Sequence, residues 1–175
     1  MTKDEMLKLC VWKERAGWFG KFVCHSPLFE REVEIHLLVE SDHKISDGTV
    51  LIVNDFLSLK TDDLAVIKRF LWEGCQECCK NSSYGFEVRE GQNETEANHE
   101  GFGVFNEEDA YAKSHLMYLQ ICEEDQELKG NYGLIHFDNE WETHGAVIVM
   151  KNGSVVGYGE DGLYVGTYED KDDTD

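Results

Sequence analysis

The sequence predicts an α+β domain in which an antiparallel sheet packs against one main helix, residues 62–80, and ends in a C-terminal β-meander. Apolar and polar side chains alternate over residues 31–40, as in a half-buried antiparallel strand. Asn152-Gly153 separates two apolar runs, which is typical of a β-hairpin. Clean helical spacing of apolar side chains occurs in one segment, which is the main helix.

The N-terminal half predicts a hairpin that precedes the main helix. Residues 4–13 are expected to form a short helix or arm, and residues 17–24 a strand that turns at Pro27 into the alternating strand. Residues 46–48 predict a turn ahead of an apolar run. Thr61 is the expected N-cap of the main helix, with two aspartates in the first turn, where the helix dipole favours acids.

The C-terminal half predicts a loop, a short helix and then strands. Residues 87–101 are polar and contain glycine, so we expect a mobile loop there. Asn106 is the expected cap of a short helix over residues 107–113. The expected strands are 116–122, 132–137, 145–151, 155–159 and 163–168, of which the last three form the meander. We expect a single domain over residues 1–168 and an acidic tail over residues 169–175.

Acidic side chains far outnumber basic ones, and the excess lies in the second half of the chain. The 175 residues include 36 acidic and 16 basic ones, a net charge of −20. Residues 1–86 carry 14 acids and 11 bases, whereas residues 87–175 carry 22 acids and 5 bases. Such a surface repels phosphate and anionic lipid, so neither nucleic acid nor a membrane is an expected partner. A basic protein is the expected partner, although a solvated acidic face has the same composition.

The six cysteines are expected to be reduced thiols, because the N-terminus has no apolar signal core and the chain is expected to be cytoplasmic. Cys75, Cys78 and Cys79 resemble a metal motif, but one Cys-x-x-Cys is half of a zinc site and no second pair follows. On a helix these thiols share a face, so we expect them in the core. Neither a metal nor a cofactor is expected.

Sequence motifs for enzymatic chemistry are absent. The chain has no phosphate-binding loop and no nucleophile elbow, and no two histidines have the spacing of a helical zinc pair. We therefore expect a protein that is not an enzyme. One alternative is a small cytosolic enzyme that uses His136 and His144 with nearby carboxylates as acid–base groups. Another alternative is an acidic adaptor for some other basic protein.

The most distinctive stretch is an acidic loop that carries a tryptophan between two late strands. Asp138, Glu140 and Glu142 surround Trp141, and His144 with a glycine opens the next strand. Trp141 is interpreted either as a structural residue at the end of the sheet or as an aromatic anchor for a basic partner, and the second is our hypothesis. The predicted partner-binding residues are Asp138, Glu140, Trp141, Glu142, His144, Glu107, Glu108 and Asp109.

Trp141, His144 and Gly145 form a Trp-x-x-His-Gly element that follows a body with one main helix. In this element the chain resembles a family of uncharacterised bacterial domains that are often encoded beside polymorphic toxins of contact-dependent inhibition and act as immunity proteins. The resemblance covers residues 102–168, and Thr143 stands where those domains usually have an acid. It implies a cytoplasmic protein that binds and blocks one cognate toxin, and it implies no catalytic residues.

The charge of the chain suits a nuclease toxin, in particular an RNase, as that partner. A nuclease must bind a polyanion, so it carries a basic cleft. An acidic inhibitor gains from this cleft through steering and through paired charges at the interface. The expected function is therefore a toxin-neutralising immunity protein for a basic toxin domain.

Overall fold

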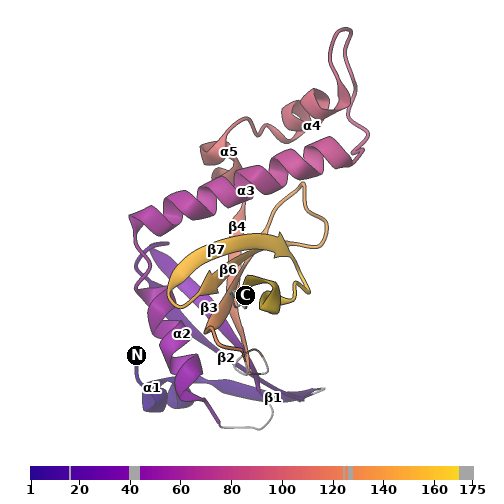
Figure 1. The fold of residues 1–175 in the computed structure, drawn as a ribbon. Coiled ribbons are helices and arrows are strands. Elements are labelled where there is room, and N and C mark those ends of the chain that lie inside the picture. The colour runs from indigo at the N-terminus through magenta and orange to yellow at the C-terminus, as the bar shows by residue number, and fades with distance from the viewer. Residues whose placement is uncertain (16, 40–43, 124, 126–127, 170–175) are drawn as a thin grey trace, which may run out of the picture.

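The computed structural model describes residues 1–15, 17–39, 44–123, 125 and 128–169. In these residues one sheet holds seven strands in the order of the chain, so the predicted α+β class is confirmed (Figure 1). The strands are β1 (Val11–Arg15), β2 (Gly17–Ser26), β3 (Arg31–Val39), β4 (His115–Cys122), β5 (Tyr132–Asp138), β6 (Ala146–Lys151) and β7 (Ser154–Glu160). The helices are α1 (Lys3–Leu9), α2 (Asp47–Leu57), α3 (Thr61–Asn81), α4 (Glu94–Phe102), α5 (Glu107–Ala112) and the 3-10 helix η2 (Val165–Tyr168).

The sheet is mixed, because β3 and β4 at its centre are parallel. Ile35 pairs with Leu119 and Leu37 with Ile121 in this register. Every other neighbouring pair is antiparallel, as predicted. A parallel pair needs a long crossover connection, and helices α2 to α5 lie in the connection between β3 and β4.

The main helix is confirmed as α3, with a cap that differs from the prediction. Thr61 is the first helical residue rather than the cap, and Lys60 occupies the N-cap position. The Asp63 carboxylate accepts a hydrogen bond from the Lys60 backbone N–H at 2.8 Å. The acid predicted for the first turn therefore satisfies an N–H group that the helix itself leaves without a partner.

Two helices cover one face of the sheet. Ile52 of α2 and Leu71 of α3 are buried in one cluster with Ile35, Ile135 and Ile148 of the strands. Figure 1 shows α3 running beside β7, with α4 and α5 on its other side. The core thus lies between the sheet and the α2–α3 layer, and α3 separates the sheet from α4.

The N-terminal region contains more regular structure than predicted. The hairpin that turns at Pro27 is confirmed as β2 and β3. Within the expected arm, α1 ends at Leu9 and the strand β1 follows as the edge of the sheet. The expected turn at residues 46–48 is the start of α2, because the Ser46 hydroxyl accepts a hydrogen bond from the Thr49 N–H and caps the helix.

The predicted loop over residues 87–101 is wrong over its second half, where α4 forms. Asn93 caps this helix, since its side-chain oxygen accepts from the Glu96 N–H at 2.9 Å. The Glu96 carboxylate accepts in return from the Asn93 N–H at 2.9 Å. This capping box lies in the polar run that favoured a loop, and Gly103 ends the helix with a left-handed φ of 67°.

The C-terminal meander consists of β4 to β7, and the strand expected at residues 163–168 is wrong. Asn152-Gly153 turns β6 into β7 as predicted, and both residues have positive φ. After β7 the chain forms η2, and Val165 packs on the second face of the sheet against Leu134 and Val149. This segment covers apolar side chains instead of adding an edge strand.

Of the expected acidic tail, residues 170–175 lie outside the described residues, and Glu169 is attached to the sheet. The Glu169 carboxylate accepts from the Tyr132 hydroxyl at 2.6 Å and from the Lys129 and Gly130 N–H groups. These hydrogen bonds, the one from Tyr132 first, lower the pKa of Glu169. In the part of the chain described, no helix combines the length and the apolar character that a membrane crossing requires.

Candidate functional site

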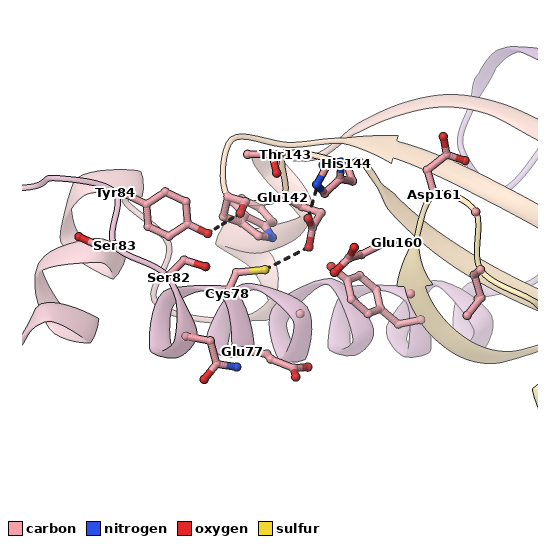
Figure 2. A pocket seen from close by; sticks show the side chains of 17 residues that line it. Glu77, Cys78, Ser82, Ser83, Tyr84, Glu142, Thr143, His144, Glu160 and Asp161 are labelled. Carbon is pink, nitrogen blue, oxygen red and sulfur yellow. Dashed lines mark hydrogen bonds between the residues drawn. The ribbon is translucent and has the colours of Figure 1, made fainter.

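A pocket of about 960 Å³ lies beside the C-terminal half of α3. One wall is α3 with the residues that follow it, a second is the turn between β5 and β6, and the third is the end of β7 with its turn (Figure 2). The pocket therefore brings together three segments that are distant in the sequence. Gly74 allows the close approach of α3 to β7, because a Cβ there would clash with the Tyr158 ring.

The turn between β5 and β6 presents the Glu142 carboxylate to this pocket. The Asn139 side-chain oxygen accepts from the Glu142 N–H at 3.0 Å, and the Gly145 N–H donates to the Glu142 carbonyl at 3.3 Å. Gly145 has a φ of 78°, which favours glycine. The Tyr84 hydroxyl donates to the Trp141 carbonyl at 2.6 Å and joins this turn to the segment after α3.

Glu142 is a nearly buried residue whose carboxylate has weak partners. The residue is 8% exposed. Its Oε2 accepts from the Cys78 thiol at 3.1 Å, as Figure 2 shows, and its Oε1 accepts from the His144 N–H at 3.5 Å. A thiol is a weak donor, and the second bond is long. No hydrogen bond or ion pair from a lysine or arginine of the described chain reaches this carboxylate.

Negative charge dominates the lining of the pocket. Among the described residues that line it are Glu77, Glu142, Glu160 and Asp161, and none is a lysine or arginine. The exposed His144 is the one histidine among these described lining residues. The pocket can therefore bind a cationic group by charge and hydrogen bonds, and it repels anions.

The thiol and phenol groups of the pocket remain protonated at neutral pH. Burial, with the Glu142 carboxylate next in effect, raises the pKa of the Cys78 thiol to about 12. Burial also raises the pKa of Tyr84 to about 12 and that of Tyr158 further. The Cys78 thiol is therefore a hydrogen-bond donor rather than a nucleophile, because nucleophilic attack needs the thiolate.

The predicted anchor, Trp141, is a core residue and not an exposed one. It is 1% exposed and contacts the Phe102 ring edge-on, with 6.3 Å between ring centroids. The hypothesis of a free tryptophan anchor is therefore wrong, and the structural interpretation holds. Within the Trp-x-x-His-Gly element, Trp141 and His144 both line the pocket, the first as a buried residue and the second as an exposed one.

The other predicted residues fall into three groups. Glu142 and His144 line the pocket, whereas the exposed Asp138 and Glu140 lie outside its lining. On α5, Glu108 pairs with Lys68 at 2.7 Å, and the Asp109 carboxylate accepts from the Phe105 N–H at 3.0 Å just before the helix. The exposed Glu107 also lies outside the pocket. The structure thus brings together three of the eight predicted residues around a cavity, namely the buried Trp141 together with Glu142 and His144.

His136 and His144 belong to different environments. His144 is exposed at the pocket, and His136 does not line it. His136 is 5% exposed and stacks on the Tyr118 ring, with 4.4 Å between centroids, and Tyr118 stacks in turn on His36. The two histidines of the alternative enzyme therefore do not share the pocket.

Sequence reasoning missed the residues of α3 and β7 that face the turn. Cys78 appeared only as one of three core thiols, and Glu160 and Asp161 fell in the gap between the expected strands 155–159 and 163–168. The burial of the Cys78 thiol against an acid 64 residues later leaves no pattern in the sequence. The clustering of acids in the second half was the one signal that pointed to this region.

These features define a one-sheet α+β domain with an acidic pocket beside its longest helix. The chain belongs to a family described as a domain of unknown function, DUF6985, which matches residues 10–171 and so includes all seven strands. No curated protein and no solved structure matches the chain.

Proposed function

We propose that this domain is a toxin-neutralising immunity protein that binds a basic toxin domain through the acidic pocket. The observation that supports this proposal most is the carboxylate of the nearly buried residue Glu142, which has a thiol and one long backbone N–H as its donors. A buried charge is costly unless a group of opposite charge pairs with it. A lysine or arginine side chain of the partner would supply that group.

Arginine suits the pocket better than lysine. Its guanidinium has five donors in a fixed fork and can satisfy more than one carboxylate, and the lining offers Glu142, Glu160 and Asp161. Lysine offers three donors from a single point. The acids outside the pocket, such as Asp138 and Glu140, would then steer the partner rather than hold it.

A nuclease, in particular an RNase, is the toxin class that this charge favours. Its basic cleft for a polyanion is complementary to an inhibitor with a net charge of −20. In this proposal the chain acts in the cytoplasm, has a protein partner rather than nucleic acid or a membrane, and needs neither catalysis nor a cofactor.

Co-expression of the chain with the product of the adjacent gene tests the proposal. We expect the wild-type chain to restore growth and Glu142→Gln, which keeps the shape but removes the charge, to weaken protection and binding at least tenfold. Glu107→Gln is the matched control, because Glu107 is an exposed acid outside the pocket. Continued cell death with the wild-type chain would reject the function, and full binding by Glu142→Gln would reject the pocket as the site.

A further inference from the structure

Two thiols of α3 and one imidazole of α4 form a cluster on the side of α3 that meets α4. The ligand atoms of Cys75, Cys79 and His99 all lie within 4.8 Å of one another. Cys75 and Cys79 are buried, and their sulfur atoms are 3.9 Å apart. The cluster is separate from the acidic pocket, since none of these three residues lines that pocket.

The spacing of the two sulfur atoms fits a tetrahedral zinc ion. Zinc–thiolate bonds of about 2.3 Å at the tetrahedral angle place two sulfur atoms about 3.8 Å apart. The 3.9 Å separation of Cys75 and Cys79 is close to this value. It arises because the two residues are four positions apart on one helix and so project from the same face.

A hydrogen bond at Nδ1 leaves Nε2 as the nitrogen of His99 that can bind a metal. His99 Nδ1 lies 2.9 Å from the Val104 carbonyl oxygen, which can only accept, so Nδ1 carries the proton. The lone pair of the neutral ring is then on Nε2. A histidine that binds zinc commonly donates its other N–H to a carbonyl or carboxylate, which fixes the ring and its tautomer.

The end of α4 makes this orientation possible. The Val104 N–H donates to the His99 carbonyl at 3.1 Å, so the two residues exchange hydrogen bonds around the left-handed Gly103. The Trp72 ring lies against the imidazole, with 5.2 Å between centroids. The ring position is therefore set by residues of both helices before any ligand binds.

A second pocket gives access to the imidazole. It has a volume of about 630 Å³, lies between α3 and the start of α4, and has His99 in its lining together with Gln76 and Lys80. A water molecule from this pocket could complete four-coordination. Cysteine, cysteine and histidine with water form a known zinc ligand set.

We propose that Cys75, Cys79 and His99 bind one zinc ion that links α4 to α3. Burial raises the pKa of both thiols, so each carries a proton without the metal. Zinc displaces these two protons as the thiolates form, so the affinity falls as the pH falls. Cys78 is not a member of the cluster, because its thiol donates to Glu142.

Cobalt(II) titration of the full, reduced chain tests the site directly. We expect one equivalent of cobalt to give a sulfur-to-cobalt charge-transfer band and the visible bands of a tetrahedral ion, and zinc to displace it. Cys75→Ser, Cys79→Ser and His99→Ala are each expected to weaken cobalt binding at least tenfold. Cys78→Ser is the matched control and should bind cobalt like the wild-type chain.

The cobalt spectrum of the wild-type chain tests the site even if a variant does not fold. Absence of the charge-transfer band in the folded wild-type chain would overturn the site, as would an equal loss in Cys78→Ser. Circular dichroism shows which variants are folded, and only these count in the comparison. A folded His99→Ala that retained the wild-type affinity would overturn the role of the imidazole and with it the link between the helices.

Discussion

Trp141 fixes the end of the sheet that carries the pocket. It is buried against Phe102 of α4, and its backbone carbonyl accepts from Tyr84, so one residue connects the turn to two segments of the helical layer. We predict that Trp141→Ala lowers the free energy of unfolding by about 3–5 kcal/mol, as large-to-small changes of buried aromatics do. Urea denaturation measures this, with Trp141→Phe as a milder control. A loss below about 1 kcal/mol would contradict the burial of the indole.

His136 makes the stability of the fold depend on pH. Burial lowers its pKa, while Asp161 opposes the shift and His36 adds to it. The unfolded chain therefore binds the proton more readily, so this contribution to stability is complete above a pH of about 6.5 and declines as the pH falls below it.

Replacement by a ring of similar size that does not titrate isolates this effect. We predict that His136→Phe unfolds at a similar urea concentration to the wild-type chain at pH 7.5 but is the more stable of the two at pH 5. Denaturation curves at both pH values measure the difference. Parallel pH profiles for His136→Phe and the wild type would refute the assignment.

At the level of elements, the capping box determines whether residues 94–102 form a helix. Asn93→Ala removes the side-chain acceptor of the Glu96 N–H, and loss of such a cap costs about 0.5–2 kcal/mol. We predict faster amide hydrogen exchange throughout α4 and unchanged exchange in α5. Asn106→Ala, which removes the cap of α5, should show the reverse pattern. If amide hydrogen exchange became equally faster in α4 and α5 in either variant, the two helices would not depend on separate caps.

Sequence patterns within short windows predicted the helices and strands whose formation depends on neighbouring residues. The β2–β3 and β6–β7 hairpins and α3 follow from alternation, a turn dipeptide and helical spacing, each contained within a short window. The capping box of α4 is also local, but its polar residues are equally common in loops. Pairing of β3 with β4 depends on contacts between distant segments, and so does the packing of η2 on the second face.

The candidate site was predictable only in its charge. Glu142 and His144 were selected because acids cluster around them, and both line the pocket. The burial of Trp141 and the facing thiol of Cys78 arise from the packing of α3 against the β5–β6 turn. Likewise the cysteines of α3 appeared as half of a motif, since their partner His99 lies 20 residues later on a helix that was expected to be a loop.

On the scale of the whole molecule, a net charge of −20 opposes the folded state. Folding brings like charges closer together, and salt screens them over a Debye length of about 10 Å at 0.1 M. We predict that sodium chloride raises the melting temperature between about 0.01 M and 0.2 M, where screening changes most. Thermal unfolding followed by circular dichroism measures this, and potassium chloride should act equally. A melting temperature that falls or stays constant would contradict the role of repulsion.

The parallel pair at the centre of the sheet sets the order in which the chain can fold during synthesis. β1 to β3 form a local hairpin unit, and β4 to β7 form a second local unit. Glu34 meets its partner Tyr118 only after about 80 further residues have been made, which takes on the order of ten seconds at ribosomal speed. During that interval the free edge of β3 is open to other chains, so the nascent N-terminal unit is the stage most exposed to misassembly.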